Sequence, residues 1–234
     1  MEQQFWYRFF KEQESLEQVE EITAVLLQQM TAQQAAHYWE LWDWLKDYQT
    51  TPTTITSLQE LLLLLLSYRE LRLSQQQLKQ LSPHLGLLWG LQTLDCSHNH
   101  LQYLPISMGQ LPLLHTLNVS HNQLLHLPES VGQISRLQQL YVAHNQLQEL
   151  PDSLAWLQQL KIIDFSNNQL HSIPPDIAWL PTLEQLNLSH NAIVEVDEDT
   201  LQAFAVLELD LRDNPLSATT INTLHANTSA NILF

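Results

Sequence analysis

Apolar and polar positions along this chain repeat at a fixed interval of 23 residues. The segment "LNVSHNQL", residues 117 to 124, begins with alternating apolar and polar residues, which predict a short strand with one buried face. Strands that recur in one register can pair side by side in a parallel sheet, so the pattern predicts a stacked solenoid. Close copies of the segment begin at Leu94, Leu140, Ile163, Leu186 and Leu209.

One polar position recurs among the apolar ones, directly after each predicted strand. Its asparagine must turn inward, where the side-chain amide can bond to backbone groups that the turn leaves unpaired. We therefore expect a ladder of buried amides with a structural role rather than a catalytic one. Its members are Asn99, Asn122, Asn145, Asn168, Asn191 and Asn214.

The complete pattern, L-x-x-L-x-L-x-x-N-x-L with a following L-P, resembles the leucine-rich repeat family in its 23-residue intracellular and bacterial form. The resemblance covers residues 58 to 216. It implies an α/β repeat solenoid, an arc whose parallel concave sheet has about seven strands and whose convex side carries short helices or irregular turns. It also implies a function in binding other proteins.

The segments that flank the repeats depart from the pattern, as capping repeats do. Apolar residues from Leu16 to Met30 share one helical face, and Thr31 with Gln34 forms the capping box of a second helix. "SLQE" from Ser57 is another capping box. It follows the polar segment "TTPTTIT", residues 50–56, which disfavours a helix. We expect a helical N-terminal domain or cap at residues 1–56, the repeats at 57–216, and a C-terminal cap with one short helix at 217–234.

Composition and charge limit the classes of partner. With 44% hydrophobic residues, 234 residues can bury a large core. Lys and Arg total 9 against 25 Asp and Glu, a formal charge of −16, so the basic surface of a nucleic-acid or anionic-membrane binder is absent and a partner with a basic surface is favoured. The longest apolar run, Leu61 to Leu66, is too short to span a bilayer, and the start of the chain lacks the pattern of a signal peptide. We expect a cytoplasmic protein.

Catalytic and cofactor chemistry finds little support in the sequence. The four glycines form neither a phosphate-binding loop nor a dinucleotide fingerprint, and no G-x-S-x-G or H-E-x-x-H motif occurs. The one cysteine, Cys96, occupies a core position of its repeat. We expect no enzymatic activity and no cofactor.

Histidines share one position of the repeat, just before the asparagine. His98, His121 and His144 are predicted to lie about 4.8 Å apart along the sheet, a distance that permits shared metal ligation. No neighbouring position of the repeat is regularly a carboxylate or a cysteine. The segment "SHNQL" is also common in the family that the chain resembles. We therefore expect a scaffold or a generic surface role for the histidines, and no bound metal.

Binding is the function that remains, and two surfaces are candidates. Tyr141 and Ile162 are apolar on an otherwise polar concave face and resemble the centre of a binding patch, although single exposed apolar residues can also be without function. On the opposite side, Trp156 and Trp179 replace glutamines and either form an interface or lie flat on the solenoid. The residues expected on the concave face are Arg72, Asp95, Asn118, Tyr141, Ile162, Asp164, Asn187 and Arg212.

The sequence thus predicts a non-catalytic protein–protein interaction module that binds its partner on the concave face. One alternative is a bacterial effector or toxin-neutralising protein that binds a basic partner. Another places a regulatory or enzymatic function in the N-terminal helices. Self-association is expected, if it occurs, through those helices or through Trp156 and Trp179.

Overall fold

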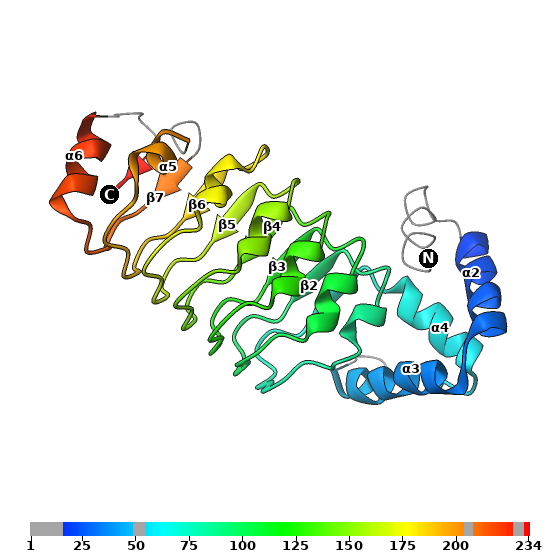
Figure 1. Cartoon of the computed structure of the whole chain (residues 1–234). Helices are drawn as coiled ribbons and strands as arrows, with labels where there is room; N and C mark the ends of the chain where they lie inside the picture. The colour runs from blue at the N-terminus through cyan, green and yellow to red at the C-terminus, as the bar shows by residue number, and fades with distance from the viewer. Residues whose placement is uncertain (1–15, 49–54, 204–207, 227–231) are drawn as a thin grey trace.

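The computed structural model describes residues 16–48, 55–203, 208–226 and 232–234. A single sheet of parallel strands runs through the molecule, in the order in which the strands occur along the chain. Figure 1 shows an elongated stack of coils with helices α2, α3 and α4 at one end and helix α6 at the other. The strands are β1 (Glu70–Arg72), β2 (Thr93–Asp95), β3 (Thr116–Asn118), β4 (Gln139–Tyr141), β5 (Ile162–Asp164), β6 (Gln185–Asn187), β7 (Glu208–Asp210) and β8 (Ile232–Leu233).

The pairing of the strands follows the sequence repeat. Leu94 on β2 pairs with Leu117 on β3, which lies 23 residues further along the chain. The described residues form eight strands where the sequence predicts about seven. Strand β8 is the additional one, in a segment expected to contribute only a short helix, because Ile232 follows Leu209 at the same interval and pairs with it. The expected helix is also present as α6 (Ala218–Ala226).

Short helical turns form the side of the solenoid opposite the sheet. Four of them begin directly after a proline, whose fixed φ suits the residue before a helical turn; these prolines are Pro105, Pro128, Pro151 and Pro174. The turns are mostly tight 3₁₀ helices, in agreement with the expected short helices or irregular turns. They are η2 (Leu85–Leu87), η3 (Ile106–Gln110), η4 (Glu129–Gln133), η5 (Asp152–Trp156), η6 (Pro175–Trp179) and the α-helix α5 (Glu198–Ala203).

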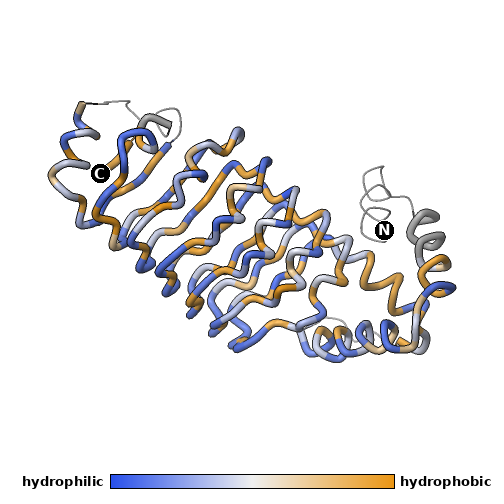
Figure 2. The backbone as a smooth tube through the Cα atoms, in the orientation of Figure 1, coloured by the Kyte–Doolittle hydropathy of each residue, from blue (hydrophilic) through white to orange (hydrophobic). Residues whose placement is uncertain are grey.

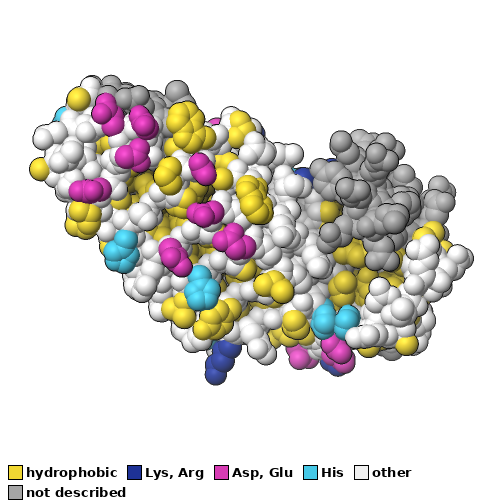
Figure 3. All heavy atoms as spheres, viewed as in Figure 1, with side chains coloured by type: hydrophobic (Ala, Val, Ile, Leu, Met, Phe, Trp, Pro, Cys, Tyr) yellow, Lys and Arg dark blue, Asp and Glu magenta, His cyan; other side chains and the backbone are white. Residues whose placement is uncertain are grey.

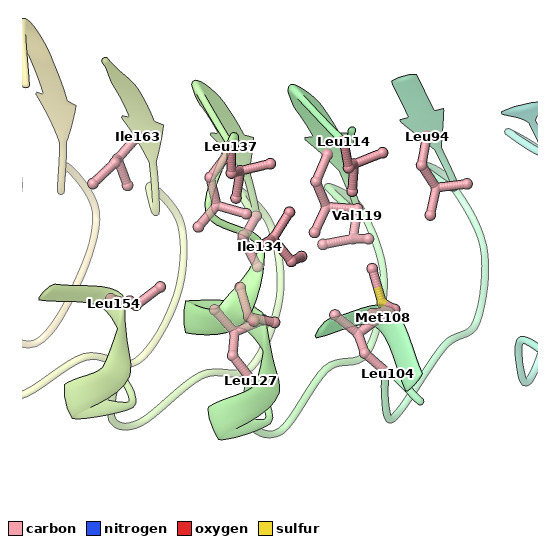
Figure 4. Packing of buried hydrophobic residues seen from close by; sticks show 14 of the residues in the cluster. Leu94, Leu104, Met108, Leu114, Val119, Leu127, Ile134, Leu137, Leu154 and Ile163 are labelled. Atoms are coloured by element: carbon pink, nitrogen blue, oxygen red, sulfur yellow. The ribbon is translucent and has the colours of Figure 1, made fainter. Parts of the chain in front are cut away.

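One apolar core fills the space between the strands and the turns. In Figure 4 the side chains on the strands, such as Ile163, extend toward those on the turns, such as Leu154, and both are buried. Figure 2 shows hydrophobic residues along the coils and hydrophilic ones at many of the bends. Burying one leucine side chain stabilises the fold by about 1.5–3 kcal/mol, so the repeated leucines dominate its stability. Cys96 lies in this core, and its burial raises the pKa of the thiol.

The N-terminal helices are α2 (Leu16–Gln29), α3 (Ala32–Leu45) and α4 (Leu58–Ser67), with the short turn η1 (Lys46–Tyr48) after α3. The capping box at Thr31 and Gln34 forms as predicted, since each side chain accepts the backbone N–H of the other residue. At α4 only half of the predicted box forms. Ser57 Oγ accepts the Glu60 N–H, but the Glu60 carboxylate accepts the N–H of Thr56, one residue further upstream.

Helices α3 and α4 extend the core of the repeats at its N-terminal end. Leu41 and Leu45 on α3 are fully buried and belong to the same cluster as Leu61 on α4 and Leu85 in the first coil. On the surface above them the Glu40 carboxylate lies 2.7 Å from His84 Nε2 and joins α3 to that coil. None of the described helices is long and apolar enough to cross a membrane.

Candidate interaction surfaces

The asparagine after each of the strands β2 to β7 ties its own coil to the preceding one. Asn145 is buried; its Oδ1 accepts the N–H of Leu124 at 2.9 Å, and its Nδ2 donates to the carbonyl oxygens of Val119 and Val142, both at 3.0 Å. Two of these three partners belong to the coil before it. Asn99, Asn122, Asn168, Asn191 and Asn214 make the corresponding bonds. The bonds give these amides a structural role, because they satisfy backbone groups of the bends.

The histidine position has an unusual backbone conformation. His98, His121 and His144 have φ angles of 54°, 55° and 55°, in the left-handed region. Residues other than glycine adopt this conformation only occasionally, and Asn, Asp and His do so more often than most. The same position holds Asn167, His190 and Asp213, also with positive φ, and in the first coil Gln75 with a φ of 60°. The bend after each strand therefore favours the residue types found there, without any need for a shared chemical function.

The three neighbouring histidines form a stack on the surface. The ring centroid of His121 lies 4.1 Å from that of His98 and 4.1 Å from that of His144. Burial, together with these two imidazoles, lowers the pKa of His121 below its ordinary value. Within the described part of the chain, no group of three or more His, Cys, Asp or Glu side chains is arranged to hold a metal ion. The stack is thus a row of flat rings in which burial and the two outer imidazoles disfavour protonation of the central one, His121.

The predicted concave residues lie mostly in one row across the sheet. Each member pairs with the next one on the neighbouring strand; the row is Arg72, Asp95, Asn118, Tyr141, Asp164, Asn187 and Asp210. Asp210 holds the equivalent position on β7, as its register position in the sequence predicts. Ile162 lies in the adjacent row, and Arg212 lies beyond the end of β7.

Several side chains of this row also hold the backbone where the strands end. The Asp95 carboxylate accepts the N–H of Ser97 at 2.9 Å, and the Asp164 carboxylate accepts that of Ser166 at 3.0 Å. Side chains of Asp and Asn commonly bond to the backbone two residues further on. Asn118, Asn187 and Asp210 make the same contact. Part of the Asp and Asn content of this face is therefore explained by the bend rather than by a ligand.

The two arginines at the ends of the concave face are each paired with the acid two residues earlier in the chain. Arg72 lies 2.8 Å from Glu70, and Arg212 makes a two-pronged contact with Asp210 at 2.6 Å and 3.0 Å. The Arg212 guanidinium lowers the pKa of the Asp210 carboxyl group. Since these pairs cancel their charges locally, Asp95 and Asp164 give the middle of the face a negative charge.

Tyr141 and Ile162 are diagonal neighbours rather than directly opposed. Tyr141 pairs with Asn118 and Asp164, whereas Ile162 pairs with Gln139 and Gln185. Diagonal side chains on adjacent strands remain within reach of an aromatic ring. Both residues are half-buried and face the open side of the sheet. They form a small apolar area bordered by amides and one carboxylate.

Trp156 and Trp179 end consecutive turns on the convex side. Their side chains are 63% and 67% exposed, while the next residues, Leu157 and Leu180, are buried. The rings therefore contribute little to the core. Tyr103, Ile106 and Leu125 are further exposed apolar residues among the earlier repeats.

Comparison with known families agrees with this geometry. A model described as Leucine Rich Repeat matches residues 90–111 and 113–134, and a model for two copies of the repeat matches residues 158–203. None of the curated proteins matches the sequence.

Solved structures of repeat proteins are similar to this chain. A leucine-rich repeat protein from Leptospira interrogans shares 32% identity over 68% of this chain and 47% of its own, with a TM-score of 0.58. An internalin from Listeria monocytogenes shares 24% identity over 66% of this chain and 44% of its own, with a TM-score of 0.58. At this identity the similarity concerns the fold alone. The ectodomain of the Arabidopsis thaliana receptor kinase GASSHO1/SCHENGEN3, in complex with CASPARIAN STRIP INTEGRITY FACTOR 2, shares 28% identity over 63% of this chain and 18% of its own, with a TM-score of 0.57. The chain spans less than half the length of each of these structures.

Proposed function

Because the chain is a leucine-rich repeat protein, we propose that it is a non-catalytic module that binds a partner protein on the concave face of its sheet. The repeat fold supports protein interaction in general. The observation that carries the finer proposal is the apolar pair Tyr141 and Ile162 in a polar surround. Interfaces commonly place an aromatic anchor at the centre and polar groups at the rim.

The proposed partner presents a basic surface to this face. Asp95 and Asp164 lie in the row of concave residues that runs from Arg72 to Asp210. The arginines near this row are already paired with Glu70 and Asp210. A partner with Lys or Arg opposite Asp164 meets an opposite charge, and an acidic partner is repelled. The formal charge of −16 favours encounter with basic proteins at long range as well.

Site-specific photo-crosslinking tests which surface binds. A photoreactive residue in place of Tyr141 is expected to crosslink the partner, and the same residue in place of Gln133, on the outer turn η4, is not. The partner identified in this way is then purified. Its dissociation constant is measured by calorimetry for the wild type, for Tyr141→Ala/Ile162→Ala, and for Gln133→Ala as the matched control.

The concave double variant is expected to bind at least about tenfold more weakly, because truncation of central aromatic residues removes most of the energy of an interface. The control variant should bind as the wild type does. Unchanged binding by Tyr141→Ala/Ile162→Ala would reject the concave face as the site. Full binding by residues 1–56 alone would instead assign the function to the N-terminal helices.

A further inference from the structure

The two exposed tryptophans lie on the convex side, away from the proposed concave site. They occupy the last position of turns η5 and η6, where the earlier turns η3 and η4 carry Gln110 and Gln133. Exposures of 63% and 67% leave most of each indole in contact with water. Large exposed aromatic rings on consecutive repeats have no role in the core, and an apolar patch of this kind often marks an interface.

Carboxylates accompany both indoles on the same turns. Asp152 begins η5 and Asp176 lies within η6, and both side chains are exposed. In a 3₁₀ helix, side chains three residues apart lie on the same side, which places Asp176 beside Trp179. In the part of the chain that the structure describes, neither Asp152 nor Asp176 forms an ion pair.

The wider surface around these turns is also acidic. In Figure 3 Asp and Glu side chains are interspersed with hydrophobic ones over the C-terminal half of the visible face, and Lys and Arg are scarce there. Between Glu129 and Asp199 the only basic residues in the sequence other than histidine are Arg136 and Lys161. Lys161 lies 3.8 Å from the Glu184 carboxylate, so its charge is partly compensated.

From this combination we propose that turns η5 and η6 form a second docking surface, which binds a Lys- and Arg-rich segment of a partner protein. Tryptophan is the side chain whose ring attracts a cation most strongly. A guanidinium group can lie against the indole of Trp179 and donate two hydrogen bonds to the Asp176 carboxylate at the same time. One coil earlier Trp156 shares turn η5 with Asp152, which precedes it by four residues rather than three, so this carboxylate adds negative charge to the same turn without the same side-by-side placement. Two indoles on consecutive acidic turns suit an extended segment with repeated basic residues.

Charge disfavours a second copy of the chain as the occupant of this surface. Each copy carries 9 Lys and Arg against 25 Asp and Glu. A symmetric pairing through Trp156 and Trp179 would also bring Asp152 and Asp176 of both copies together, and like charges at an interface oppose association. A basic segment neutralises these carboxylates instead.

The test uses the full chain and two synthetic peptides, oligoarginine and an isosteric neutral oligocitrulline of equal length. Binding is followed by calorimetry and by tryptophan fluorescence at about 0.15 M salt, where long-range attraction to the acidic protein is screened. Oligoarginine is expected to bind and oligocitrulline is not. Trp156→Gln/Trp179→Gln, which installs the residue of the earlier repeats, should weaken oligoarginine binding about tenfold.

Two matched variants separate a local site from general electrostatic attraction. Asp152→Asn/Asp176→Asn should weaken binding severalfold, while Asp43→Asn/Asp47→Asn makes the same change in net charge at the distant helix α3 and turn η1 and should leave binding unchanged. Tyr141→Ala/Ile162→Ala should also leave it unchanged, because those residues belong to the concave site. The melting temperature of each variant verifies folding, and Trp156→Phe/Trp179→Phe, which keeps an aromatic ring, should bind with intermediate affinity.

Three outcomes overturn the proposal. The first is equal binding of oligoarginine to the wild type and to Trp156→Gln/Trp179→Gln. The second is an equal loss for the Asp152/Asp176 and Asp43/Asp47 variants, which means attraction to net charge only. The third is a self-associated wild type in sedimentation that becomes monomeric on replacement of both tryptophans, which would make a second copy the occupant. None of these results bears on binding at Tyr141 and Ile162, so failure here is distinct from failure of the concave site.

Discussion

A Cβ atom placed on Gly132 would lie 2.2 Å from the carbonyl oxygen of Ser153 on the next coil. Gly86 and Ser107 have the same relationship at 2.2 Å, two repeat intervals earlier in the chain. The backbones of successive turns therefore touch at this position, and a side chain has no room there. Ala155 occupies the position of Gly132 one repeat later. In the turn that follows Ala155, the exposed Asp176 occupies the position of the buried Ser153.

Gly132→Ala is expected to destabilise the protein, although alanine usually favours helical backbone over glycine. The added methyl group meets backbone rather than a flexible side chain, and overpacking of this kind costs about 1–3 kcal/mol. Urea denaturation measures the difference, with the exposed neighbour Gln133→Ala as the control. Equal or greater stability of Gly132→Ala would mean that the turns separate easily.

Asn145→Ala should lower the free energy of unfolding by about 1–3 kcal/mol, because the backbone N–H of Leu124 and the carbonyl oxygens that Asn145 binds remain buried without it. Gln146→Ala, the adjacent exposed residue, should change it little. The denaturation midpoints of the two variants provide the comparison. Identical midpoints would contradict a stabilising role for the amide ladder.

Acid should weaken the fold at the histidine stack. Burial and the neighbouring imidazoles lower the pKa of His121, so the unfolded chain binds a proton more readily than the native protein does. The contribution of His121 to stability is therefore present above the unfolded pKa of about 6.5 and is lost as pH falls through the lower native value.

His121→Asn should reduce the fall in melting temperature between about pH 7.5 and about pH 5, since it removes this titration. Asparagine is a suitable replacement because Asn167 adopts the same left-handed backbone in a later coil. His171→Asn, an exposed histidine outside the stack, is the control. The same acid-induced loss in His121→Asn as in the wild type would show that the stack does not contribute.

Leu41→Ala should destabilise the first repeats as well as helix α3. Leu41 is fully buried and shares the core cluster with Leu61 and Leu85, so its truncation is expected to cost about 2–5 kcal/mol. Gln33→Ala, exposed on the same helix, should be nearly neutral. Hydrogen exchange would show faster opening of β1 and η2 in the variant. Protection unchanged in that region would contradict our proposal that residues 1–56 act as a cap of the repeats.

The sequence by itself determined the repeated coil. Apolar positions at an interval of 23 residues defined which side chains enter the core, and pairs such as Leu94 with Leu117 follow from that interval alone. The buried position of Asn145 was also predictable, because an amide among leucines must find backbone partners. The capping box at Thr31 depends only on neighbouring residues and formed as predicted, since such contacts require no distant part of the chain.

Only the tertiary structure decided how the coils meet one another. The left-handed backbone at His121 and the contact between Gly132 and Ser153 depend on groups that are brought together by stacking. The sequence also does not determine how much negative charge the concave and convex faces present to a partner. That charge depends on which acids bond to arginines or to the backbone. Arg212 is held by Asp210, whereas Asp152 and Asp176 form no ion pair among the described residues, and this difference arises from side-chain geometry rather than from residue type.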